Sequence, residues 1–190
     1  ELADTDLYME SLATKDNFHQ PAGDYRIVHL STHGKANDKM GDYSFLAFHD
    51  KKDSSESWLY NRELYGLDLN ADMVVLSACE TGIGELQRGE GIISLARGFS
   101  YAGAKSIVTT LWSVNDQSTQ KLMELFYGHL KQGMRKDAAL RQAKLDYLDK
   151  YPNLGTAPYF WAGIIPIGDM SPVDLSSGFN WWWIALAAVG

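Results

Sequence analysis

One run of four apolar residues constrains the fold of this chain more than any other feature. Met73-Val74-Val75-Leu76 contains two adjacent β-branched residues and no polar residue, a pattern typical of a strand buried on both faces of a parallel sheet. The run ends at small residues, and a glycine-rich stretch follows, so Cys79 stands where the strand ends. In open α/β sheets, ligands bind beyond the carboxyl ends of the strands. The sequence therefore predicts a site at this point.

A second predicted strand ends in the same way. Residues 25–31 are predicted to form a strand, which is followed by Thr32-His33-Gly34. The carboxyl ends of parallel strands lie at one edge of a sheet, so His33 and Cys79 are well placed to meet.

The remaining pattern predicts a mostly parallel sheet covered by helices, because strands and helices alternate. Strands are expected at 43–48 and 58–60, which form a hairpin, and at 105–111 and 160–167. Helices are expected at 11–18, 61–65, 92–101 and 136–148. A further helix is expected to begin at a Ser113-x-x-Asp116 cap and to end at about Gly133. Pro166 places the last strand at an edge or ends it.

Composition bounds the class of protein. A chain of 190 residues that is 45% hydrophobic can bury one core, so one domain is expected. The net charge of −7 argues against nucleic-acid binding. One cysteine excludes an internal disulfide and suits a reducing compartment. The five histidines are scattered and have no cysteine nearby, so neither a metal nor another cofactor is expected.

Cysteine chemistry requires a base, because a thiol becomes a good nucleophile only when it is ionised. An imidazole at His33 can take the proton, and glycine at position 34 lets a substrate approach the backbone. Alternatively, Cys79 is a small buried hydrophobic residue, as most isolated cysteines are. The neighbouring carboxylate of Glu80 disfavours a thiolate at Cys79, so a base at His33 has to outweigh it.

Three other residues have an ordinary structural interpretation beside a functional one. His29 lies within a strand and is expected to be a packed sheet residue. Asp116 is expected to cap a helix, with a pocket role second. Trp112 fits the core, but it also follows the end of a strand on the side where Cys79 and His33 are expected.

Several segments resemble a known family, and they occur in the family's order. They include His29-Leu30-Ser31-Thr32-His33-Gly34 and residues 75–82, 89–91, 102–112 and 159–163. Together they resemble the CHAT domain, a caspase-like cysteine peptidase domain of bacteria and some eukaryotes in the clan of caspases and separases. The resemblance runs from about residue 13 to residue 169.

This resemblance implies a three-layer α/β/α sandwich of the caspase–haemoglobinase type, with a mostly parallel central sheet. It also implies a dyad of His33 as base and Cys79 as nucleophile. Cys79 follows His33 by 46 positions, near the roughly 50 typical of caspases. By analogy, the oxyanion hole uses the backbone N–H groups of Gly34 and Cys79. The implied substrate pocket contains Ser77, Glu80, Thr110, Trp112 and Asp116.

The ends of the chain suggest a fragment. Residues 1–170 are expected to form the CHAT domain without the family's first strand, and residues 171–178 have the composition of a linker. Residues 179–190 are strongly apolar and contain Trp181-Trp182-Trp183 near their start, which resembles the beginning of a truncated transmembrane helix. The alternative is a tail packed on the domain.

Ala157 stands at a position where the family frequently has a histidine.

The function that follows is that of a cysteine endopeptidase acting on a protein or peptide substrate. It is expected in the cytoplasm, and a membrane tether at the C-terminal segment is a further expectation. An upstream helical-repeat region of the tetratricopeptide type, or a regulatory protein, is the expected partner. One alternative is a catalytically silent CHAT module for protein interaction or signalling, and another is a thioesterase or acyl-transfer enzyme with the same dyad.

Overall fold

The computed structural model describes residues 6–19, 22–35, 37, 40–49, 57–77, 79–80 and 90–174. For residues 79–80 and 90–92 it describes the backbone alone. The glycine-rich loop is expected at residues 80–91, and its part at 81–89 lies outside the described residues, while residue 80 belongs to a strand and residues 90–91 begin a helix. The predicted apolar tail at 179–190 and the linker beyond residue 174 also lie outside the described residues.

The central sheet contains four strands in the order β1, β5, β7, β8. β1 (Ile27–Leu30), β5 (Met73–Leu76) and β7 (Ser106–Thr110) are parallel. β8 (Ile164–Gly168) runs antiparallel to β7 at the edge. All residues of β5 and β7 are buried, as expected for parallel strands covered on both faces.

A second sheet continues the first at the carboxyl ends of β1 and β5. Its order is β4 (Trp58–Tyr60), β3 (Phe45–Ala47), β2 (His33–Lys35) and β6 (Cys79–Glu80). β2 begins three residues after the end of β1, and the N–H of Ser77 donates to Leu30 O across 3.0 Å. β3 and β4 pair antiparallel, so the predicted hairpin is confirmed.

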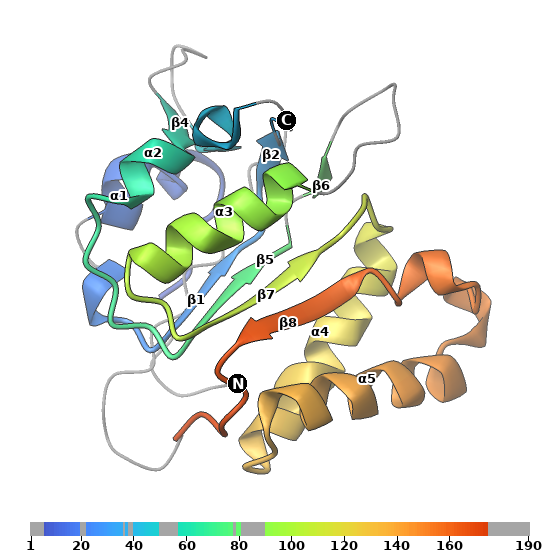
Figure 1. Cartoon of the computed structure of the whole chain (residues 1–190). Helices are drawn as coiled ribbons and strands as arrows, with labels where there is room; N and C mark the ends of the chain where they lie inside the picture. The colour runs from blue at the N-terminus through green and yellow to red at the C-terminus, as the bar shows by residue number, and fades with distance from the viewer. Residues whose placement is uncertain are drawn as a thin grey trace.

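Helices cover both faces of the central sheet (Figure 1). One face carries α1 (Lys15–His19), α2 (Asn61–Leu64) and α3 (Glu90–Tyr101), and the other carries α4 (Asp116–Lys131) and α5 (Lys136–Lys150). The connections contain short 3-10 helices at η1 (Glu10–Leu12), η2 (Ala22–Asp24), η3 (Gly41–Tyr43), η5 (Pro152–Leu154) and η6 (Pro158–Phe160). The predicted three-layer α/β/α sandwich is confirmed.

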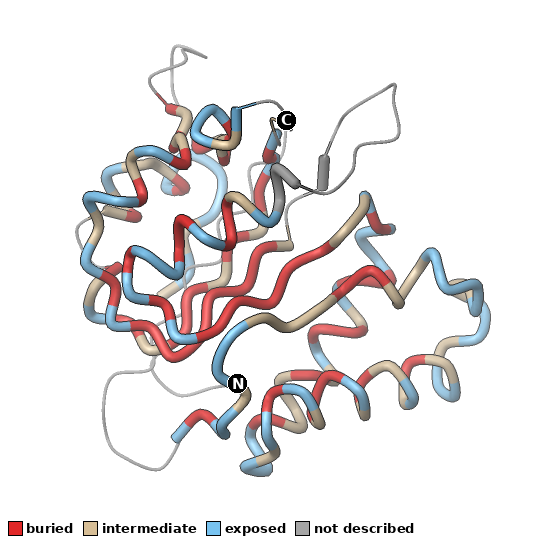
Figure 2. Tube along the Cα trace, viewed as in Figure 1, coloured by how far each residue is buried: buried red, intermediate tan, exposed pale blue. Residues whose placement is uncertain are grey.

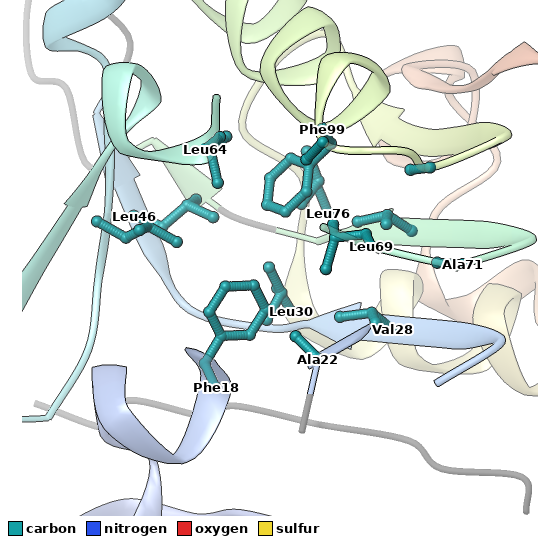
Figure 3. Close-up of a cluster of buried hydrophobic side chains, with 14 of the residues drawn as sticks. Phe18, Ala22, Val28, Leu30, Leu46, Leu64, Leu69, Ala71, Leu76 and Phe99 are labelled. Carbon is teal, nitrogen blue, oxygen red and sulfur yellow. The ribbon is translucent and has the colours of Figure 1, made fainter. Parts of the chain in front are cut away.

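The strands divide their side chains between two apolar clusters, because successive residues of a strand point to opposite faces. Val28 and Leu30 pack with Phe18, Leu64 and Phe99 on the α1–α3 face (Figure 3). The other face holds a cluster built from Ile27, Met73, Val75, Val108, Leu122, Phe126 and Tyr147. In Figure 2 the buried strands lie between helices whose outer sides are exposed.

Three local predictions differ from the structure. Residues 11–18 contain a 3-10 turn and the short helix α1 instead of one helix. The last strand begins at Ile164, because residues 158–160 form η6. The cap of α4 is Asn115, whose side-chain oxygen accepts from the N–H of Ser118 across 3.1 Å, while Asp116 is the first residue of the helix. Asparagine side chains compete well for free N–H groups at this position.

Pro166 lies on the edge strand, as predicted. Leu111 N–H donates to Gly163 O, and Asp169 N–H donates to Lys105 O. The backbone groups that bond to β7 therefore belong to odd-numbered residues along β8. The backbone nitrogen of Pro166 accordingly faces away from β7. A proline there removes one donor that another strand would use for pairing. Within the described ranges, no helix is long and apolar enough to span a bilayer.

Candidate functional site

The backbone brings His33 and Cys79 to one position. β2 and β6 are parallel neighbours, and in their register His33 is paired with Cys79 and Gly34 with Glu80. Adjacent strands lie about 4.8 Å apart, so two residues paired in this way are direct neighbours. Both strands lie beyond the carboxyl ends of the central parallel strands, where sites form in open α/β sheets.

The environment of His33 leaves its ring open to solvent. His33 and Lys35 are exposed, whereas Gly34 between them is buried. Gly34 pairs with Leu46 of β3 on one side and with Glu80 of β6 on the other. Thr32, just before the strand, is also buried, and its hydroxyl donates to Ala47 O, which ties the start of β2 to the hairpin. His33 is therefore an accessible side chain on a well-anchored backbone.

Ser77 lies one step deeper in the sheet, two residues before Cys79. Its N–H donates to Leu30 O, and its Oγ lies 2.9 Å from His29 Nε2. His29 Nδ1 lies 3.0 Å from the hydroxyl of Tyr127 on α4. Burial lowers the pKa of His29 from its usual 6.5 to about 4, so the imidazole is neutral near neutral pH. Burial also raises the pKa of Tyr127, which keeps its proton.

The sequence predicted the position of His29 in a strand but not its contacts with other side chains. His29 was expected to be a packed sheet residue, and it is one, since it belongs to β1. Its contacts with Ser77 and Tyr127 were not predicted, because these residues lie 48 and 98 positions away. The sequence signal for this network was His29 itself, a single polar residue within an apolar strand.

The other predicted pocket residues lie around the end of β7. Leu76 pairs with Thr109, so Ser77 and Thr110 stand one residue further along neighbouring strands. Thr110 is buried, while Asp116 is exposed at the first turn of α4. The side chain of Glu80 lies outside what the structure describes.

Trp112 is held against the segment that precedes β8. Its Nε1–H donates to Tyr159 O across 2.9 Å. Its ring packs so closely on Gly163 that a Cβ at that glycine would lie 2.6 Å away. Any side chain at position 163 would push the ring aside, which explains the glycine.

A cavity in the described part of the structure lies away from the paired strands. Among the described residues, no group of three His, Cys, Asp or Glu side chains is arranged to hold a metal ion. A cavity of about 450 Å³ lies between η3, α2 and α3, and its lining includes Tyr43, Tyr65, Ser94, Arg97 and Tyr101. Its walls contain none of the predicted site residues.

Comparison with known proteins agrees with this architecture. The family profile of the CHAT domain matches residues 2–169. Tetratricopeptide repeat protein 28 of Mus musculus is 30% identical over 115 residues, and so is the protein of the same name from Homo sapiens. Each match covers 60% of this chain and 4% of the relative, so this chain corresponds to a small part of either protein.

Proposed function

This chain belongs to the CHAT domain family, and on that premise we propose that it is a cysteine endopeptidase with Cys79 as nucleophile and His33 as base. The observation that supports the proposal best is the register of β2 and β6, which pairs these two residues directly. The caspase-like fold and the exposure of His33 also support it. A dyad of this kind needs neither a metal nor another cofactor.

The proposed reaction is acyl transfer in two steps. His33 takes the thiol proton, and the Cys79 sulfur attacks the peptide carbonyl carbon. Backbone N–H groups of Gly34 and Cys79 donate to the developing oxyanion. His33 then protonates the departing amine as the C–N bond breaks, which leaves a thioester. His33 then takes a proton from water, the water oxygen attacks the thioester carbon, and the C–S bond breaks. His33 returns the proton to the Cys79 sulfur as the carboxylic acid departs.

The partner and location belong to the same proposal. The chain resembles a protein named for tetratricopeptide repeats, so we propose that a helical-repeat region or regulatory protein presents the substrate or controls access to it. A reducing compartment, the cytoplasm, is proposed because Cys79 must remain a thiol. The proposal includes a membrane tether at residues 179–190.

The test uses the full chain and a panel of electrophilic peptides that differ in the residue before the reactive group. Cys79 is the only cysteine, so covalent labelling measured by mass spectrometry reports on one site. We expect rapid labelling of the wild-type chain and none of Cys79→Ala. His33→Ala should slow labelling by roughly 10²–10⁴-fold. Because His33 is exposed, its loss should leave the melting temperature nearly unchanged.

One result separates this proposal from a catalytically silent interaction module. If the folded wild-type chain reacts with every peptide no faster than free cysteine does, and His33→Ala changes nothing, the dyad is not functional. The silent module is then the correct alternative.

A further inference from the structure

His29 connects the interior of the protein to the strand that carries the candidate nucleophile. Its ring nitrogens contact Ser77 Oγ at 2.9 Å and the Tyr127 hydroxyl at 3.0 Å. The His29 and Tyr127 rings are also in contact, with centroids 5.8 Å apart. The catalytic steps proposed above use none of these three residues.

The donor and acceptor strengths of Tyr127, His29 and Ser77 favour one direction for the two hydrogen bonds that join them. The buried imidazole is neutral, so one ring nitrogen carries hydrogen and the other accepts. A phenol is a stronger donor than an alcohol, and an alcohol oxygen is the better acceptor. Tyr127 therefore donates to Nδ1, and Nε2–H donates to Ser77 Oγ. The hydrogen of Ser77 then points away from His29.

The position of Ser77 determines which groups its hydroxyl hydrogen can reach. Ser77 is half-buried and lies between the Leu30–Leu76 pair and the His33–Cys79 pair. Its backbone is held by the hydrogen bond from its N–H to Leu30 O. Because the Ser77 oxygen already accepts a hydrogen bond from His29, the Ser77 hydroxyl can donate its hydrogen to a group that is bound beside the paired strands.

We propose that His29 and Tyr127 are positioning residues that orient the Ser77 hydroxyl as a donor to the substrate residue before the cut. Substrates whose side chain at that position accepts a hydrogen bond are preferred over apolar side chains of the same size. This inference rests on the proposed function, because it is read out through the reaction of Cys79.

The experiment compares two electrophilic peptides that differ only in asparagine or leucine before the reactive group. These side chains have similar size, and only asparagine accepts a hydrogen bond. We expect the wild-type full chain to label faster with the asparagine peptide by roughly three- to tenfold, the effect of one neutral hydrogen bond. Ser77→Ala should bring the ratio of the two rates close to one.

Two substitutions at His29 separate positioning from simple packing. His29→Gln places an amide near the original Nε2 and keeps a donor for Ser77, so the ratio should be retained. His29→Asn places its amide near Nδ1 and keeps the contact with Tyr127 but not that with Ser77, so the ratio should fall. His129→Gln is the matched control, because His129 is also a partly buried, hydrogen-bonded histidine, paired with Asp146 at 3.0 Å.

The outcomes distinguish failure of the inference from failure of the proposed function. Iodoacetamide, which has no peptide, should label Cys79 equally in all variants and so reports on thiol reactivity alone. A wild-type chain that reacts with iodoacetamide but with neither peptide contradicts the peptidase. A wild-type chain that reacts with both peptides, with a ratio unchanged in Ser77→Ala or equal in the two His29 variants, overturns the positioning role.

Discussion

At the scale of single residues, Asp72 organises the end of the sheet opposite the candidate site. It precedes β5, and its carboxylate accepts from Arg26 before β1 and from Lys105 before β7, the latter at 2.7 Å. Burial by itself raises the pKa of Asp72, but the hydrogen bonds from Lys105 and Arg26 outweigh it and hold the pKa below its usual value. Since the pKa is lower in the folded state, this carboxylate stabilises the protein above its unfolded pKa of about 4. The stabilisation is lost as pH falls through the folded pKa.

We therefore expect Asp72→Asn to lower the free energy of unfolding by roughly 1–3 kcal/mol near neutral pH, because it removes a charged acceptor from Arg26 and Lys105. Water screens the pair with Lys105, whose side chain is exposed, and this keeps the expected loss within that range. The difference from wild type should shrink in denaturant titrations below about pH 4. Glu124→Gln is the control, because its pair with Lys121 lies on the surface and its loss should change the free energy of unfolding far less than Asp72→Asn does. A difference between Asp72→Asn and wild type that is unchanged at low pH would contradict the assignment.

At the scale of elements, the start of α4 distinguishes two neighbouring candidates for the cap. Asn115 accepts from the N–H of Ser118, whereas Ser113 lies two residues earlier and is exposed. Asn115→Ala should cost about 1 kcal/mol, or roughly 2–4 °C in melting temperature for a domain of this size. Ser113→Ala should change it by less than 1 °C or so. Equal losses in both variants would show that the capping role is shared.

At the scale of the whole molecule, the two apolar clusters are expected to unfold together. Neighbouring residues of β1 belong to different clusters, with Ile27 on one face and Val28 on the other, so neither cluster can open while the strand stays paired. Phe99→Ala and Phe126→Ala should each cost about 3–5 kcal/mol. Circular dichroism and tryptophan fluorescence should report the same single transition for both variants. Tyr101→Ala, an exposed position, is the control, and two separate transitions would contradict a shared core.

The sequence by itself determined the central strands, the hairpin and the longer helices, together with their buried faces. The apolar run of β5, the spacing of Leu122, Phe126 and Leu130 on α4, and the hairpin of β3 and β4 all follow from local periodicity. Periodicity is visible in the sequence because it reflects which side of an element faces the core. It also explains why the ends of two strands could be predicted to lie at one edge of the sheet.

Only the tertiary structure decided how distant segments align. The pairing of His33 with Cys79, the antiparallel direction of β8 and the contacts of His29 with Ser77 and Tyr127 each join residues far apart in the chain. Register between strands depends on the simultaneous packing of both sheet faces, and no local pattern encodes that. Local chemistry thus determined which residues can act, and packing decided which of them are neighbours.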